Sequence, residues 1–243
     1  MASKAEHVKA LFESPGKYLV PRRFDIEIRV ETVQEFTKNL TFDRVLDIGC
    51  GNGAISLPLL PRCSNLTLLD ISKNMLDLAR RQVPPERVND IQLIEGEFLG
   101  AAAQPESFDL ILCIGVLAHV DSPAAIIAKV AQLAKPGSWV VLEFTDAFHF
   151  WGVQVMLYQN LLKLVRSEPY ALNRLRRRQI ESICQENSLK TLAVYRYGLP
   201  PIGASMFIDQ EQMYRITRYL FGPSEQNRNR WMGNQFICLL QKT

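Results

Sequence analysis

No stretch of this sequence approaches the ~18 consecutive apolar residues that a membrane span requires. The N-terminus, Met1 to His7, has no apolar signal region either. The 28 Lys and Arg residues nearly balance the 25 Asp and Glu residues, so no excess of one charge marks a nucleic-acid binder. From these absences we expect a cytoplasmic protein without a membrane span, and we do not expect nucleic acid as its partner.

Cysteine pairs are also missing. The five cysteines are odd in number, widely separated and mostly set in apolar runs, with no C-x-x-C pair to suggest a metal or redox site. We therefore expect reduced thiols in the core and no metal.

With 243 residues and 47% hydrophobic content, the chain is long enough to bury one full core. We predict a single domain over residues 1–243, with an N-terminal arm (1–40), a core (41–145) and a substrate side (146–243).

The most informative stretch is residues 45–53, which read V-L-D-I-G-C-G-N-G. Its apolar residues are typical of a strand buried on both faces, and the alternating glycines allow a tight turn that a ligand can approach closely. Asp70 ends a second apolar run about 20 residues later, where a carboxylate can accept hydrogen bonds from ribose hydroxyls. Together they predict a nucleotide-type cofactor site.

The glycine spacing separates two classes of cofactor. A dinucleotide loop needs G-x-G-x-x-G, whereas this chain has G-x-G-x-G, preceded two residues earlier by Asp47. A carboxylate there repels phosphate and favours a ligand carrying an ammonium or sulfonium charge. The stretch D-I-G-C-G-N-G resembles the first motif of class I S-adenosylmethionine-dependent methyltransferases. The resemblance extends over residues 45–144. Within this class, the chain resembles the methyltransferases that act on small molecules.

Apolar runs and helical patterns alternate along the chain, which predicts a parallel sheet. We expect strands at residues 44–48, 66–69, 91–94, 110–114, 139–144, 190–197 and 235–240. We expect helices at residues 24–40, 53–60, 125–134, 150–165, 172–185 and 210–220, and one more that carries Met75, Leu76, Leu78 and Ala79. Ser122-Pro123 predicts a capped helix start, and Asp70 or Ser72 can cap the helix after the second strand. The resemblance implies an α/β fold: a Rossmann-like, seven-stranded, mostly parallel sheet with helices on both faces, a helical N-terminal arm, two insertions and an antiparallel last strand.

The resemblance also implies which residues bind S-adenosylmethionine, the expected cofactor, and its product S-adenosylhomocysteine. These candidates are Asp47, Gly49, Cys50, Gly51, Asn52, Asp70, Ile71, Met75, Gly96, Glu97, Phe98, Ile114, Gly115 and His119. Most of them fall at the carboxyl ends of the expected strands, where open α/β sheets bind ligands.

Some of these candidates have a second interpretation. Asp70 can be a ribose ligand and also cap a helix, Met75 can pack against adenine or belong to the core, and Glu97 can accept from the adenine amino group or be a solvated loop residue. His119 can be a general base or a structural neighbour of the cofactor. A base matters only if the acceptor must lose a proton, because methyl transfer depends chiefly on alignment. His149, and also Glu143 or Asp146, are the alternative bases.

The acceptor side is less defined. The apolar helix expected at residues 150–165 reads either as a substrate lid or as a core or homodimer-interface helix. We expect the acceptor pocket to be lined by the arm and by Tyr18, Phe150, Trp151, Tyr158 and Met206. Two basic groups, Arg174 to Arg178 on a predicted helix and Arg228 with Arg230 beside Trp231, read as solvated surface or as sites for an anion.

The aromatic candidates favour methyl transfer to a moderately hydrophobic small molecule, such as a natural-product or quinone-like phenol, by in-line displacement. One alternative is an RNA or protein methyltransferase that uses the basic helix. Another is a non-catalytic partner subunit of the same fold. A nicotinamide oxidoreductase is disfavoured by Asp47 and by the glycine spacing.

Overall fold

The structure, a computed structural model, describes residues 4–14, 16, 19, 23–149, 153, 172–198 and 207–243. It contains one seven-stranded sheet in the order β3-β2-β1-β4-β5-β7-β6. The strands are β1 (Phe42–Ile48), β2 (Cys63–Asp70), β3 (Ile91–Glu95), β4 (Phe108–Cys113), β5 (Ala134–Thr145), β6 (Leu189–Tyr197) and β7 (Gln235–Lys242).

The sheet is parallel except for β7. β1 pairs with β2 and β4, β2 with β3, and β4 with β5, all in parallel, whereas β7 runs antiparallel to both β5 and β6. The continuous apolar run of β4 is buried on both faces, as expected for a central parallel strand. The predicted strands and the antiparallel last strand are therefore confirmed, and most extend a few residues beyond their predicted ends.

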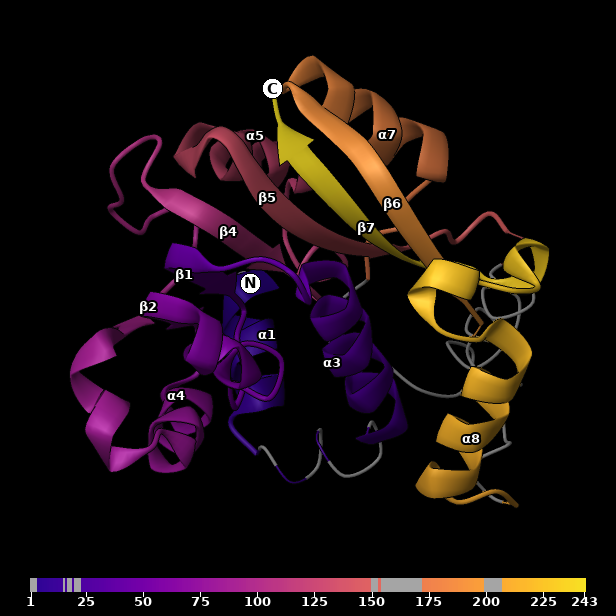
Figure 1. Cartoon of the computed structure of the whole chain (residues 1–243), viewed down its shortest axis with the longest axis horizontal. Helices are drawn as coiled ribbons and strands as arrows, with labels where there is room; N and C mark the ends of the chain where they lie inside the picture. Colours follow the sequence, from indigo (N-terminus) through magenta and orange to yellow (C-terminus); the bar gives the residue numbers. More distant parts are fainter. Residues whose placement is uncertain are drawn as a thin grey trace.

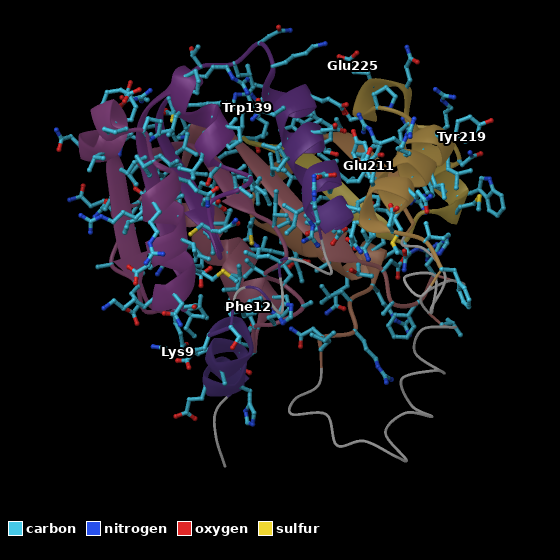
Figure 2. The ribbon with its side chains drawn as sticks, turned by 90° about the horizontal axis from the view of Figure 1, so that it is seen from below. Lys9, Phe12, Trp139, Glu211, Tyr219 and Glu225 are labelled. Atoms are coloured by element: carbon cyan, nitrogen blue, oxygen red, sulfur yellow. The ribbon has the colours of Figure 1, made fainter. Side chains whose placement is uncertain are left out.

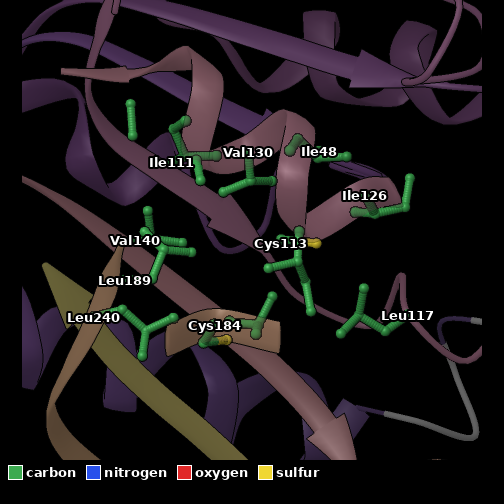
Figure 3. Close-up of a cluster of buried hydrophobic side chains, with 14 of the residues drawn as sticks. Ile48, Ile111, Cys113, Leu117, Ile126, Val130, Val140, Cys184, Leu189 and Leu240 are labelled. Carbon is green, nitrogen blue, oxygen red and sulfur yellow. The ribbon is translucent and has the colours of Figure 1, made fainter. Parts of the chain in front are cut away.

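Helices cover both faces of the sheet (Figure 1). The α-helices are α1 (Lys4–Phe12), α3 (Arg23–Thr37), α4 (Lys73–Gln82), α5 (Pro123–Leu133), α7 (Arg177–Glu186) and α8 (Gln210–Phe221). In Figure 1, α5 and α7 lie on one side of the sheet and α3, α4 and α8 on the other. The core accordingly has two apolar layers, and Figure 3 shows the layer beneath α5 and α7, where Val130 and Cys184 meet the strand residues Ile111 and Val140.

Two helix starts follow from local sequence. The Ser72 hydroxyl accepts from the backbone N–H of Met75 at the start of α4, and Ser122 caps α5 through Ala125. Pro123 occupies the first turn of α5, where a missing N–H costs no hydrogen bond. Of the two predicted caps for α4, Ser72 is therefore the one that forms.

Two predicted helices are wrong in part. Residues 53–60 do not form an α-helix; the chain makes turns and then the 3-10 helix η2 (Leu57–Arg62), since Pro58 and Pro61 each lack the N–H that an α-helix needs. The helix predicted from residue 172 starts only at Arg177. The residues before it pair instead with the core, through the backbone bonds Asn173 N–H to Ala118 O and Ala147 N–H to Leu175 O. Arg174 and Arg176 therefore precede the helix.

Shorter 3-10 turns complete the fold: η3 (Pro85–Asp90), η5 (Ser224–Gln226) and η6 (Arg230–Met232). All five cysteines are buried and free. Within the described ranges, no helix has the length and apolar character that crossing a bilayer would take.

Candidate functional site

A cavity opens at the carboxyl ends of β1, β2 and β4, as the sheet topology predicts. Most of the predicted cofactor residues line it: Gly49, Gly51, Asp70, Ile71, Met75, Gly96, Glu97, Phe98, Ile114, Gly115 and His119. Asp47, Cys50 and Asn52 are not in the lining. Sequence reasoning missed the remaining wall residues, which are Val8, Phe12, Ile48, Leu69, Leu99, Val116, Val120, Asp121 and Ile126.

The glycine turn after β1 is held against β2. The backbone N–H of Gly49 donates to Leu69 O at 2.8 Å, and Gly49 adopts a φ of +67°. A Cβ at this position would lie 2.7 Å from Cγ2 of Val116, so a side chain would both strain the backbone and clash. Glycine is therefore required where the turn passes the wall of the cavity.

Asp70 joins the two motifs. One carboxylate oxygen of Asp70 accepts from the backbone N–H of Gly51 at 2.8 Å, and the other accepts from Ser72 N–H at 2.8 Å. Burial raises the pKa of this carboxyl, and the backbone N–H groups of Ser72, Gly51 and Ile71 oppose the rise. Each oxygen keeps a second lone pair, so the carboxylate can still accept from two neighbouring hydroxyls in the cavity.

Asp47 lies beneath the glycine turn rather than in the cavity wall. Burial raises its pKa to about 7, the Ser56 side chain opposes the rise, and the charge of Asp70 adds to it. Its Oδ2 atom is buried without a hydrogen-bond partner among the described residues. Two carboxyl groups thus flank one glycine turn, an arrangement that disfavours a phosphate and favours a cation.

The connection after β3 forms another wall. Gly96 N–H donates to Asp70 O at 3.0 Å, and the Phe98 side chain is buried while that of Glu97 is exposed. Lys129 of α5 fixes this loop: its Nζ donates to Phe98 O and Ala101 O, both at 2.6 Å. An exposed Glu97 carboxylate beside a buried aromatic ring can accept from a planar amino-bearing base.

Gly115 follows β4 and separates the cavity from a buried charged cluster. Gly115 has a φ of +75°, and a Cβ there would lie 3.8 Å from an Nη1 of Arg29 and 4.0 Å from an Oε2 of Glu143. Within the cluster, Arg29 pairs with Asp25 at 3.1 Å and with Glu143 at 2.9 Å, while the Tyr197 hydroxyl donates to Asp25 at 2.6 Å. Glu143, predicted as an alternative base, is therefore held in an ion pair.

The helix α1 covers the cavity. Val8 and Phe12 line it, four residues apart on one helix face. The end of α1 is tied to α4, since Ser72 Oγ donates to Phe12 O at 3.2 Å and Asn74 donates to Glu13 O at 2.9 Å. Figure 2 shows Phe12 on the side of α1 nearest the sheet. The i, i+4 spacing of Val8 and Phe12 is a signal in the sequence that could have identified them.

The candidate histidines lie in different surroundings. His119 lines the cavity, and its ring meets the Phe12 ring edge-on, with centroids 5.8 Å apart. His149 does not line the cavity; its Nε2 contacts Trp231 O at 2.7 Å. Asp146 Oδ1 accepts from Phe148 N–H at 3.0 Å. The predicted acceptor residues Tyr18, Phe150, Trp151, Tyr158 and Met206 lie outside the described residues.

Comparison with known proteins agrees with this geometry. A family model described as "Methyltransferase domain" matches residues 46–142. Ubiquinone biosynthesis O-methyltransferase from Bordetella parapertussis is 36% identical over 114 residues, which are 46% of this chain and 47% of that protein. The enzyme of the same name from Hydrogenovibrio crunogenus is 33% identical over 114 residues, covering 46% of each chain. The match thus spans about half the length of these curated relatives.

Solved structures share the fold over almost the whole chain. A methyltransferase from Thermotoga maritima, described as a possible histamine N-methyltransferase, has a TM-score of 0.70 at 14% identity, covering 99% of this chain and 100% of that one. Magnesium protoporphyrin IX methyltransferase from Synechocystis, solved with bound S-adenosylhomocysteine, has a TM-score of 0.67 at 17% identity with the same coverage. The likeness establishes a Rossmann-like class I methyltransferase fold.

Proposed function

We propose that this chain, whose residues 46–142 form a class I S-adenosylmethionine-dependent methyltransferase domain, transfers a methyl group to a small-molecule acceptor. The observation that carries the proposal is the pair of buried carboxyl groups around the glycine turn. Asp70 presents acceptor lone pairs beside Gly51, and Asp47 Oδ2 lies behind the turn with no hydrogen-bond partner in the described part of the chain. This arrangement suits sugar hydroxyls and a positive charge, and it opposes the diphosphate of a nicotinamide cofactor.

The residues present fit the cofactor as follows. Asp70 would accept from the ribose hydroxyls, Ile71, Met75 and Phe98 would enclose the adenine, and Glu97 would accept from its amino group. The backbone at Ile114 and Gly115 would meet the methionine end, near Asp47, Gly49, Cys50, Gly51 and Asn52. S-adenosylmethionine, when bound, supplies a methyl group on a positively charged sulfur.

The chain's own contribution to the reaction is alignment and exclusion of water. Transfer from a sulfonium is an in-line displacement, so holding the two reactants in line supplies much of the acceleration. Val8 and Phe12 of α1 cover the cavity and keep water out of it. We propose that His119 supports Phe12 in this position rather than acting as a base, because its ring already packs edge-on against that side chain. His149, whose Nε2 contacts Trp231 O, can act as the general base only if the acceptor reaches its ring.

For the acceptor, we propose a moderately hydrophobic phenol of natural-product or quinone-like type. The aromatic side chains Phe150, Trp151 and Tyr158, with Tyr18 and Met206, are the proposed lining. Support comes from the relatives, which carry the name ubiquinone biosynthesis O-methyltransferase.

The test is a screen of pure protein with methyl-labelled S-adenosylmethionine against catechols and hydroxyquinones, total RNA and a protein mixture. We expect label in the phenols alone. Label in RNA or protein would contradict the small-molecule assignment. Cofactor binding without transfer to any acceptor would contradict the catalytic role, and absence of binding in calorimetry would leave a non-catalytic partner subunit of the same fold.

A further inference from the structure

Two basic groups that are far apart in sequence meet in the structure at one end of the sheet. We define the arginine cluster as Arg176 and Arg177 at the start of α7, Arg196 of β6 and Arg230 of η6. The guanidinium of Arg196 lies 4.5 Å from the ring centroid of Phe236, and that of Arg177 lies 5.7 Å from the same centroid. One buried phenylalanine of β7 therefore brings two cations together.

The other two arginines adjoin this pair. The guanidinium of Arg176 stacks 4.0 Å from the ring centroid of Phe148, the residue before His149. His149 contacts Trp231 O at 2.7 Å. This contact places η6, which contains Arg230, beside the segment that follows β5. Arg196 donates to Gly233 O at 2.9 Å at the end of the same turn. The four arginines thus belong to one continuous set of contacts.

The cluster carries more positive than negative charge. Arg177 pairs with Glu181 at 2.6 Å, but within the described part of the chain no ion pair forms at Arg176, Arg196 or Arg230. Burial lowers the pKa of Arg196 most, and the charges of Arg177 and Arg230 lower it further. The charges of Asp146 and Glu181 raise this pKa. Asp146 and Glu181 are thus the acidic side chains that face Arg196. The Nε of Arg196 is buried, and no described residue forms a hydrogen bond with it.

The segment before α7 connects the arginine cluster to the loop after β4, which lines the cavity. Asp146 and Leu175 form a parallel bridge, and Ala147 N–H donates to Leu175 O at 3.1 Å, so the segment after β5 and the segment before α7 lie side by side next to the cluster. On the cavity side, the Asn173 amide donates to Leu117 O at 2.9 Å, in the loop that carries His119. Arg177 is four residues further along, so at about 3.5 Å per residue it lies within about 14 Å of Asn173.

We propose that the arginine cluster binds the anionic group, a carboxylate or a phosphate, of the methyl acceptor. Four guanidinium groups against two carboxylates leave a positive excess, which favours an anion that can bridge the arginines. Among the described residues no side chain caps the first turn of α7, so its backbone N–H groups would add donors for such an anion. The acceptor would then carry its negative charge at one end and its nucleophile at the other. This inference rests on the proposed function.

The first test measures anion binding without turnover. Inorganic pyrophosphate is titrated into the full chain and followed by the fluorescence of Trp231, which is 66% exposed beside Arg230. The variant Arg176→Gln/Arg230→Gln changes two exposed side chains, and Arg80→Gln/Arg81→Gln removes the same charge from exposed positions of α4. We expect saturable binding that weakens roughly tenfold or more in the first variant and is unchanged in the second. Equal weakening in both variants, or no saturable change, would overturn the proposal.

The second test connects the site to the acceptor. A catechol carboxylic acid and its methyl ester are compared as acceptors, with Arg196→Gln as a further variant. We expect the wild type to prefer the acid through a lower KM at similar kcat, and the arginine variants to lose this preference while retaining cofactor affinity. An equal KM for acid and ester, or binding of the cluster to anionic vesicles but not to pyrophosphate, would contradict it. If the wild type did not bind S-adenosylmethionine, that result would instead refute the proposed function.

Discussion

The carboxylate of Asp70 accepts a hydrogen bond of 2.8 Å from the backbone N–H of Gly51. This bond joins the ends of β1 and β2, so the acidic residue fixes the glycine turn as well as facing the cavity. A charge-assisted bond of this kind is stronger than one between neutral groups. The shape of the turn and the charge of the cavity therefore depend on the same side chain.

The raised pKa of Asp47 predicts a pH dependence. Near pH 6 a group with a pKa of about 7 is largely protonated. A bound cation lowers that pKa, so binding should release a proton below pH 7 and affinity should rise between pH 6 and 8. Calorimetry in two buffers with different ionisation enthalpies measures the released proton. Asp47→Asn should abolish the release; an unchanged release in this variant would rule Asp47 out as its source.

The Asp47 carboxyl group also makes the free energy of unfolding depend on pH. Its pKa in the folded chain is raised from the ordinary 3.8 to about 7, so protonation stabilises the fold more than the unfolded chain. The contribution is complete below the unfolded value and is lost as the pH rises through 7. Asp47→Asn should therefore remove part of the loss of stability between pH 4 and 7, measured by urea unfolding at each pH. A loss as large as in the wild type would contradict this.

Arg29 is predicted to be a major contributor to stability. Its side chain is 10% exposed and neutralises Asp25 and Glu143 in the interior. Arg29→Met should cost about 3 to 5 kcal/mol of unfolding free energy, because it leaves buried carboxylates unpaired. Arg23→Met removes an exposed i,i+4 pair with Glu27 in the same helix and is the matched control. Urea denaturation that gives equal losses for the two variants would refute the role of the cluster.

Phe12 is predicted to retain the cofactor. Phe12→Ala removes one wall of the cavity. It should weaken S-adenosylhomocysteine binding roughly tenfold, because the ligand would complete the burial of this half-buried ring and fully burying a phenylalanine contributes about 1.5 to 3 kcal/mol. The control Ala10→Gln alters an exposed position of α1. Stopped-flow measurement should show faster release in Phe12→Ala only. Unchanged release would mean that α1 does not cover the bound cofactor.

A variant of His119 can distinguish its packing against Phe12 from a role as general base. His119→Phe keeps an aromatic ring against Phe12 but has no group that can take a proton. If the histidine is structural, turnover at saturating cofactor should stay within about twofold of the wild type, whereas removal of a general base costs about 10²-fold or more. A loss of that size at neutral pH, reduced at high pH, would restore the base assignment.

The sequence predicted the sheet and the position of the cavity at its carboxyl edge because their signals are local. Buried parallel strands are continuous apolar runs, and the glycine turn and Asp70 follow two such runs directly. The helix predicted at residues 53–60 was wrong because the hydrophobic pattern outweighed Pro58 and Pro61 in the prediction.

Long-range contacts could not be predicted in this way. Arg29 and Glu143 are 114 positions apart, and nothing in the local pattern of either residue indicates the other. The covering role of α1 depends on its contacts with Ser72 and His119, which only the folded chain brings together. Similarly, the arginines at the start of α7 and in η6 appear as two unrelated surface groups until Phe236 and Trp231 connect them.

The most direct test of the account is titration calorimetry of S-adenosylmethionine into the wild type and into Asp70→Asn, with Asp77→Asn on the exposed face of α4 as the control. We expect one site per chain in the wild type and in the control, and affinity lower by roughly ten- to a hundredfold in Asp70→Asn, which loses a charged acceptor. Equal affinity in all three proteins, or binding of a nicotinamide dinucleotide in place of S-adenosylmethionine, would contradict it.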